Sequence, residues 1–291
     1  LRWTDSRMGV RSQPAPDDQE VSMPKSQASA GTFRSGLPYN LLGHGPRILV
    51  FFQGLQFENK PPTGHLARLM LSMYRFLGEE HTAYMVTRKP GLPEGYSMQD
   101  IADDYATMIR QEWASPVDVI GTSTGGSIAQ HFAADHPDLV RWLVIHSSAY
   151  TPGDAAKEVQ LHIGRLARQE KWREASAALI GFIMPPGWFG RIATALGSLL
   201  MSLSAPKGPS DLCVTVEAED RHDFKDRLGE ITAPALVIAG DQDPFYTEAL
   251  FRDTAIGIPN ARLILYEGMG HPARGKEFGQ DLLAFLKEGA A

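Results

Sequence analysis

The stretch VDVIGTSTGGSIAQHF, residues 117–132, decides the fold because it places a serine between glycines directly after an apolar run. The residues before the glycines are mostly β-branched, which favours a buried strand. Ile128 and Phe132 lie one helical turn apart, which favours a helix after the turn. Residues 121–125 fit Gly-x-Ser-x-Gly, a pattern that exposes a serine such as Ser123 on a sharp strand-to-helix turn. On this pattern alone, a glycine-rich turn without chemistry is an equally good interpretation, so the rest of the chain must decide.

The composition limits the classes of protein to consider. Of the 291 residues, 43% are hydrophobic and 21% are charged, which is typical of a globular protein with a sizeable core. The formal net charge is −6 and no run of Lys or Arg stands out, so we expect no nucleic-acid partner. Cys213 is the single cysteine, which excludes an intrachain disulfide and a cysteine-based zinc site. Its sequence context predicts a small buried side chain.

Two segments bear on membranes and localisation. Residues 1–30 are rich in Ser, Gln, Pro and Asp and hold no apolar signal core, so they predict a flexible tail. Met23 is a candidate natural start, which would make the residues before it an upstream extension. The longest apolar stretch, residues 178–203, is interrupted by Pro-Pro-Gly at 185–187 and predicts two short amphipathic helices. We therefore expect a cytoplasmic protein without a membrane span.

Strand and helix patterns alternate along most of the chain. Strands are predicted at residues 32–36, 39–45, 47–54, 82–88, 117–121, 140–148, 233–243 and 261–268. Helices are predicted at residues 66–77, 97–113, 124–133, 247–256 and 278–286. This alternation predicts the α/β class, with a mostly parallel central sheet and helices on both faces. The alternation stops between Thr151 and Asp226, where the pattern is helical throughout.

Side chains that can carry chemistry follow three of the predicted strands. Such sheets bind ligands beyond the carboxyl ends of their strands. Ser123 follows one strand, Asp241 and Asp243 follow another, and His271 follows the last. The order Ser, Asp, His is the chain order of a triad on this kind of sheet. The turn at Ser123 is therefore predicted to lift its hydroxyl toward His271.

These residues resemble the α/β-hydrolase superfamily, from about Thr32 to the C-terminus. The resemblance rests on GTSTGG at 121–126, ALVIAGDQDPF at 235–245 and GMGHPA at 268–273. It implies the α/β-hydrolase fold, in which an insert at the position of the helical segment forms a cap. The expected division is a tail at residues 1–30, a core at 31–150 and 227–291, and a helical cap at 151–226.

The resemblance also implies a role for each member of the triad. A serine hydroxyl is a weak nucleophile, so Ser123 needs His271 as a base, and a buried carboxylate orients the imidazole. Asp243 fits the Gly-x-x-Asp pattern of the superfamily, and Asp241 is the alternative acid. Some relatives take the acid from the end of the preceding strand, but residues 146–148 read His-Ser-Ser and hold no carboxylate.

The resemblance further implies an oxyanion hole formed by the backbone N–H groups of Leu55 and Thr124. Many relatives carry His-Gly where this chain has Gln53-Gly54, but a backbone donor survives that change. Candidate pocket residues are Gln53 and His146 at the sheet edge, with Met184 and Trp188 from the insert. No metal site and no cofactor are implied.

The nucleophile type narrows the reaction. Relatives that open epoxides or remove halides use Asp at the elbow, whereas this chain has Ser123. The resemblance therefore favours hydrolysis of carboxylic esters through an acyl-enzyme intermediate, with an apolar small molecule as substrate. A carbon–carbon bond hydrolase, a lactonase or a haloperoxidase could use the same triad. A ligand receptor without catalytic activity is the alternative from another class. The oligomeric state does not follow from the sequence.

Overall fold

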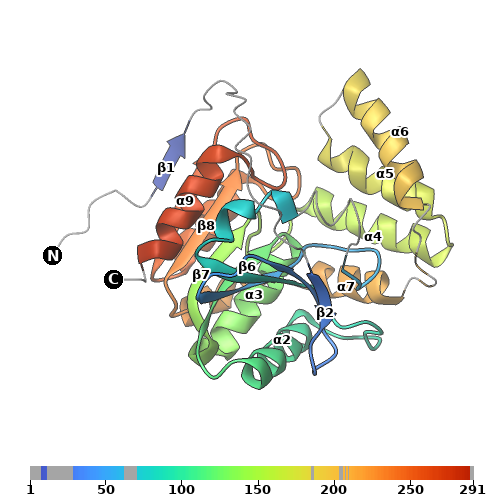
Figure 1. Cartoon of the computed structure of the whole chain (residues 1–291). Helices are drawn as coiled ribbons and strands as arrows, with labels where there is room; N and C mark the ends of the chain where they lie inside the picture. Colours follow the sequence, from blue (N-terminus) through green and yellow to red (C-terminus); the bar gives the residue numbers. More distant parts are fainter. Residues whose placement is uncertain are drawn as a thin grey trace.

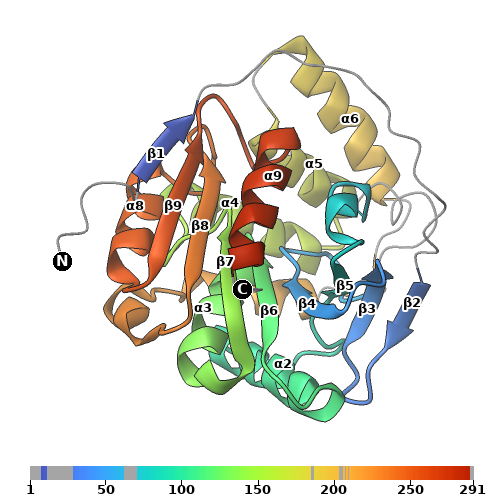
Figure 2. The same cartoon turned by 60° about the vertical axis from the view of Figure 1, so that its left-hand side comes forward.

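The computed structural model describes residues 8–11, 29–61, 71–184, 187–202, 206, 208 and 210–288 (Figure 1). In this part of the chain, nine strands form one sheet in the order β1-β9-β8-β7-β6-β4-β5-β3-β2 (Figure 2). The strands are β1 (Met8–Arg11), β2 (Ser29–Thr32), β3 (Pro38–Leu42), β4 (Arg47–Phe52), β5 (His81–Val86), β6 (Val117–Thr122), β7 (Val140–His146), β8 (Ala235–Gly240) and β9 (Ala261–Tyr266). Seven of the eight predicted strands are present with shifted ends. The strand predicted at 32–36 is wrong, because only Thr32 lies in a strand, at the end of β2, and residues 33–36 form the turn to β3.

The centre of the sheet is parallel and buried on both faces. Strands β4 to β9 run parallel to one another, whereas β3 pairs antiparallel with β5 and β2 pairs antiparallel with β3 at one edge. All residues of β8, Ala-Leu-Val-Ile-Ala-Gly, are buried. A strand covered on both faces needs a continuous apolar run of this kind. The predicted fold class is confirmed.

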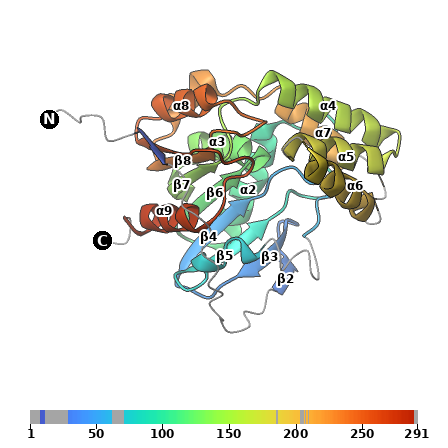
Figure 3. The ribbon, with the colours of Figure 1, turned by 90° about the horizontal axis from the view of Figure 1, so that it is seen from above.

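Helices cover both faces of the sheet. The helices of the described residues are α2 (Met98–Glu112), α3 (Thr124–Asp135), α4 (Asp154–Arg168), α5 (Trp172–Ile183), α6 (Trp188–Ser202), α7 (Ser210–Asp220), α8 (Glu248–Gly257) and α9 (Lys276–Lys287). Helices α2, α3 and α8 lie on one side of the sheet and α9 lies on the other (Figure 3). Ile101, Phe132 and Phe251 belong to the apolar core of the first side, and Leu77 and Phe285 to that of the second.

The N-terminal segment contributes to the sheet. Residues 1–30 are predicted to be a flexible tail, but Met8–Arg11 forms β1 and pairs in parallel with Leu263–Tyr266 of β9. Without β1, β9 would be an edge strand with unpaired backbone groups, which readily accept another strand. Residues 1–7 and 12–28, which include Met23, lie outside the described residues. Residues 66–70 of the helix predicted at 66–77 also lie outside them, and the described end of that segment forms a 3₁₀ turn at Arg75–Leu77.

The insert between β7 and β8 contains α4, α5, α6 and α7, which gather beyond one end of the strands (Figure 1). Its two ends meet where the Phe224 N–H donates to the Tyr150 carbonyl oxygen over 2.8 Å. The hydroxyl of Thr151 also donates to the His222 carbonyl oxygen over 2.9 Å. The insert has a small apolar core of its own, in which Cys213 is buried as predicted. The two amphipathic helices predicted around Pro-Pro-Gly correspond to α5 and α6.

Candidate active site

The turn at Ser123 places a strained residue at the carboxyl edge of the sheet. Strand β6 ends at Thr122 and α3 begins at Thr124. Ser123 between them has φ 54° and ψ −126°, a conformation that costs about 1–3 kcal/mol for a residue other than glycine. Gly125 allows the turn to approach β4, because a Cβ at this position would lie 1.9 Å from the Phe52 carbonyl oxygen. The sequence therefore forms the predicted strand, sharp turn and helix.

Ser123, His271 and Asp243 form one chain of hydrogen bonds. The distance from Ser123 Oγ to His271 Nε2 is 3.1 Å, and the distance from His271 Nδ1 to Asp243 Oδ2 is 2.7 Å. A proton on Nδ1 donates to the carboxylate, which leaves Nε2 free to accept from the serine hydroxyl. The second oxygen of Asp243 accepts the N–H groups of Phe245 and Tyr246, over 2.9 and 3.3 Å. The carboxylate is thus held in place from both sides.

The alternative acid, Asp241, has a different partner. Its Oδ1 atom accepts the Gly268 N–H over 2.7 Å, in the loop that follows β9. The structure therefore brings Asp243 to the imidazole and places Asp241 on a backbone contact of the neighbouring loop.

The loop that carries His271 is fixed by the end of β7. His146 Nε2 donates to the Ala273 carbonyl oxygen over 2.8 Å, and the Ala273 N–H donates to Ser147 Oγ over 2.9 Å. His146 Nδ1 is then free to accept the Thr122 hydroxyl over 3.1 Å. Burial lowers the pKa of His146 to about 4, an effect that the hydrogen bond to Ala273 opposes. His146 is therefore neutral near neutral pH and braces the loop from within the protein.

A mostly apolar cavity of about 360 Å³ opens onto Ser123 and His271. Apolar and aromatic residues from the core and from α5 line most of it: Phe51, Met73, Tyr74, Met85, Leu179, Ile183 and Phe245. Gln53, predicted for the pocket, is among the lining residues. Its side-chain amide donates to the Met85 carbonyl oxygen over 3.1 Å and accepts from Gln56 over 3.1 Å.

The other three residues predicted for the pocket lie elsewhere. His146 is fully buried behind the cavity, as its contact with Ala273 requires. Met184 follows α5 and lines a different cavity. Trp188 begins α6 and is 75% exposed to solvent. Helix α6 packs on α5, and none of its described residues lines the cavity at Ser123.

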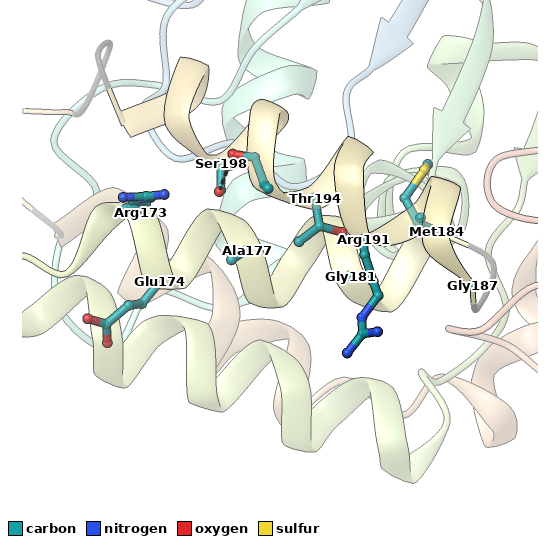
Figure 4. Close-up of a pocket in the computed structure, with 11 residues that line it drawn as sticks. Arg173, Glu174, Ala177, Gly181, Met184, Gly187, Arg191, Thr194 and Ser198 are labelled. Atoms are coloured by element: carbon teal, nitrogen blue, oxygen red, sulfur yellow. Dashed lines mark hydrogen bonds between the residues drawn. The ribbon is translucent and has the colours of Figure 1, made fainter.

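That second cavity, about 670 Å³, lies between α5 and α6 (Figure 4). Arg173 and Ser198 lie at one end of it and Met184 and Gly187 at the other (Figure 4). It is larger than the cavity at Ser123, but its lining holds no nucleophile beside a base. The candidate active site is therefore the smaller cavity.

Two buried charged residues near Ser123 were not singled out from the sequence. Arg88 follows β5 and donates to the carbonyl oxygens of Gln53 and Gly54. Glu219 of α7 accepts the hydroxyl of Thr124 over 2.6 Å. Arg88 stands just after a strand, and this position could have marked it as a candidate site residue from the sequence. Glu219 stands in the acidic run VEAED, which is typical of a solvated helix face and gives no signal.

A model of the alpha/beta hydrolase family matches residues 27–278. The chain belongs to this family. A protein from Serratia proteamaculans (strain 568), provisionally named carbamate hydrolase RutD, is 26% identical over 187 residues, or 63% of this chain and 69% of that protein. A pimeloyl-acyl-carrier-protein methyl ester esterase from Neisseria meningitidis is 26% identical over 184 residues, or 60% of this chain and 69% of the esterase.

Among solved structures, the enol-lactonase from Burkholderia xenovorans LB400 shares the fold of this α/β hydrolase, with a TM-score of 0.70. The match has 18% sequence identity and covers 89% of this chain and 100% of the lactonase. Among the described residues of the hydrolase, no helix is both long and apolar enough to cross a membrane. The same residues contain no group of three or more His, Cys, Asp or Glu side chains placed to hold a metal ion.

Proposed function

We propose that this α/β hydrolase cleaves carboxylic esters by attack of Ser123, through an acyl-enzyme intermediate. The proposal rests above all on the hydrogen-bonded series Ser123, His271 and Asp243 at the edge of an apolar cavity. The names of two similar proteins, a methyl ester esterase and an enol-lactonase, describe the same type of reaction.

In the first half of the reaction, Ser123 Oγ attacks the ester carbonyl carbon while His271 Nε2 takes the hydroxyl proton. The carbonyl π electrons move to the oxygen, which becomes an oxyanion. The oxyanion then collapses, the carbon–oxygen bond to the alcohol breaks, and the alcohol leaves with the proton from His271. In the second half, water repeats these steps on the acyl-Ser123 ester and releases the carboxylic acid.

The oxyanion needs donors that already face it. Thr124 is the first residue of α3, so its N–H has no acceptor within the helix and lies at the positive end of the helix dipole. The second proposed donor is the N–H of Leu55, for which the described residues provide no acceptor. Gly54 packs against Ser123, since a Cβ on Gly54 would lie 3.9 Å from Ser123 Oγ. These observations support the N–H groups of Leu55 and Thr124 as the proposed donors to the oxyanion.

The cavity supports a small, mainly apolar substrate. Its volume of about 360 Å³ is in the range of small-molecule sites, and most of its lining is apolar. A charged acyl group would lose hydration there without gaining a partner of opposite charge, apart from Arg274 at the rim. We infer that esters with uncharged acyl chains are preferred.

The first test compares wild type with Ser123→Ala on p-nitrophenyl esters from acetyl to long acyl. We expect kcat to fall by about 10⁴-fold or more because the nucleophile is lost. Ser176→Ala is the control, because among the described residues the Ser176 hydroxyl bonds only the Trp172 carbonyl oxygen, within α5. A fluorophosphonate probe should label wild type and Ser176→Ala and leave Ser123→Ala unlabelled.

Other outcomes have distinct meanings. Turnover that persists in folded Ser123→Ala would remove this serine from the mechanism. Probe labelling of Ser123 without turnover of any ester would favour hydrolysis of another bond by the same nucleophile, such as a lactone or a carbon–carbon bond. If the folded protein shows no labelling and no turnover, this result would favour a ligand receptor.

A further inference from the structure

Arg88 is a fully buried guanidinium beside the candidate active site. It follows β5, and its side chain is shielded from solvent. In the described part of the chain it forms no salt bridge, although burial lowers the pKa of Arg88 and the nearby charge of Glu219 opposes that effect. Removing a charge from water costs several kcal/mol unless hydrogen bonds compensate. The hydrogen bonds that compensate the buried charge of Arg88 should therefore indicate its role.

All of these contacts are made to one short segment. Arg88 Nη1 donates to the carbonyl oxygen of Gln53 over 3.0 Å and to that of Gly54 over 3.1 Å. Its Nη2 atom also donates to the Gly54 oxygen, over 3.1 Å. The Nε atom has no partner among the described residues. Among the described residues, the guanidinium of Arg88 therefore donates only to two consecutive peptide groups.

The second of these peptide groups carries the N–H of Leu55. A peptide group is planar and trans, so the Gly54 carbonyl and the Leu55 N–H lie in one plane and point in opposite directions. Two N–H groups of Arg88 fix the direction of the carbonyl, and they thereby fix the direction of the N–H. Donation to the carbonyl oxygen also polarises the amide, which strengthens its N–H as a donor.

We propose that Arg88 is a positioning residue, which orients and polarises the Gly54–Leu55 peptide so that the Leu55 N–H stabilises the oxyanion. This inference rests on the ester hydrolysis proposed above. Arg88 acts through the peptide and does not contact the reacting atoms. Since the oxyanion develops only as Ser123 attacks and is absent from the bound substrate, Arg88 should affect kcat much more than KM.

The test replaces Arg88 with Met and with Lys and compares each variant with Lys89→Met. Lys89 is the adjacent, half-exposed residue, whose nearest carboxylate is Asp104 at 3.9 Å. Each preparation is titrated with a fluorophosphonate so that kcat refers to active sites only, and folding is checked by circular dichroism. The same preparations are then titrated with an alkyl trifluoromethyl ketone, which Ser123 converts to a bound oxyanion.

For Arg88→Met we expect kcat to fall about 10²-fold, the loss typical of one oxyanion donor, with KM changed less than about threefold. Affinity for the trifluoromethyl ketone should fall by a similar factor. Arg88→Lys keeps the charge but not the planar, bidentate donor, so its losses should be about tenfold. Lys89→Met should match wild type in both measurements.

Wild-type kcat and ketone affinity in folded Arg88→Met would overturn the proposal. If Arg88→Met does not fold, unchanged values in Arg88→Lys would overturn it equally. A merely structural role would lower the number of titratable sites and leave kcat per site unchanged. Ester turnover that depends on Ser123 but not on Arg88 would refute this inference alone, whereas turnover independent of Ser123 would refute the proposed function.

Discussion

Two aspartates that are two positions apart have different partners in this hydrolase. Asp243 contacts His271, and Asp241 contacts the backbone of the next loop. In the proposed mechanism Asp243 selects the imidazole tautomer and stabilises the imidazolium, so we expect Asp243→Asn to lower kcat about 10³–10⁴-fold. Asp241→Asn should keep kcat within about threefold of wild type, because its amide oxygen can still accept the Gly268 N–H. Steady-state ester hydrolysis measures both.

The two variants are a matched pair, with the same chemical change at the same end of β8. Equal losses in both would mean that the charge of the region, rather than the contact with His271, supports turnover. A large loss in Asp241→Asn alone would assign the acid to that residue.

At this scale, the sequence was informative where a residue stands at a strand end. Ser123, Asp243 and His271 each follow a predicted strand, and parallel strands bring such residues to one edge of the sheet. Their catalytic roles stay predictions, but their proximity was predictable. The burial of Arg88 and Glu219 was not predictable from the sequence. Which side of a helix or of a strand end becomes buried depends on segments that are distant in the chain.

At the scale of elements, α7 is tied to the start of α3 by a buried carboxylate. Glu219 accepts the hydroxyl of Thr124 over 2.6 Å, that of Ser127 over 3.2 Å and that of Tyr246 over 3.5 Å. Burial raises the pKa of Glu219, and the hydrogen bonds from Thr124 and Ser127 only partly offset it. The insert and the turn at Ser123 thus share a buried carboxyl group that has little access to water.

This contact predicts a pH dependence of stability. Above the pKa of an unfolded Glu, the folded protein retains a proton at Glu219 that the unfolded chain has lost. The free energy of unfolding should therefore decrease as pH rises through the raised pKa. Glu219→Gln cannot ionise, so the stability of wild type relative to this variant should fall as pH rises above the pKa of an unfolded Glu. Urea unfolding at several pH values measures both proteins.

The difference between the free energies of unfolding of wild type and Glu219→Gln at each pH cancels the contributions of all other titrating groups. Parallel curves for wild type and Glu219→Gln would contradict the raised pKa. Glu219→Ala adds a second comparison, because it leaves the hydroxyls of Thr124 and Ser127 without their acceptor. We expect it to lower the free energy of unfolding by about 2–4 kcal/mol at all of these pH values.

The helices of the insert show what the sequence pattern could not settle. The interruption at 185–187 was sufficient to predict two helices. It could not predict that α6 would pack on α5 and leave Trp188 exposed, because an amphipathic pattern defines a face and not its partner. Met184 and Trp188 were candidates for the pocket for this reason, whereas Leu179 and Ile183 of α5 line it.

At the scale of the whole molecule, Asp118 joins four strands at the end of the sheet opposite to Ser123. This buried carboxylate of β6 accepts two hydrogen bonds from Arg141 of β7, over 2.7 and 2.8 Å. Arg47 of β4 and His81 of β5 each lie 3.5 Å away. Burial alone would raise the pKa of Asp118, but the hydrogen bonds and positive charges outweigh burial and lower it.

We expect Asp118→Asn to lower the free energy of unfolding by about 3 kcal/mol at pH 7, because it leaves Arg141 and Arg47 without their counter-charge. A lowered pKa stabilises the folded state above the unfolded pKa, and this stability is lost as pH falls through the folded pKa. The deficit of Asp118→Asn should therefore shrink under strongly acidic conditions. Chemical denaturation between pH 3 and pH 7 measures it.

Asp138→Asn is the matched control, since Asp138 forms an exposed ion pair with Arg110 at 3.4 Å. Such a pair contributes about 0–1 kcal/mol, so this variant should remain close to wild type. Similar deficits in both variants would contradict a special role for Asp118. Both variants should keep wild-type kcat while folded, because neither residue lies at the carboxyl edge of the sheet.

The overall fold was largely predictable because its periodicities are local. Apolar runs alternating with amphipathic helices permit few arrangements other than a parallel sheet covered on both faces. The pairing of β1 with β9 was not predictable, because nothing in the composition of residues 1–30 indicates a strand, and the pairing depends on an edge more than 250 positions away.

The meeting of Tyr150 with Phe224 has a consequence for how such a protein can change. The chain leaves the sheet and returns to it at almost the same point, so the insert is a module attached at a single position of an otherwise continuous core. A shorter, longer or differently shaped segment can be joined there without altering the spacing of β7 and β8. Ser123, His271 and Asp243 all lie outside the insert, at the ends of sheet strands. Exchange of the insert can therefore change which substrates fit the cavity, while the side chains at the strand ends stay in place.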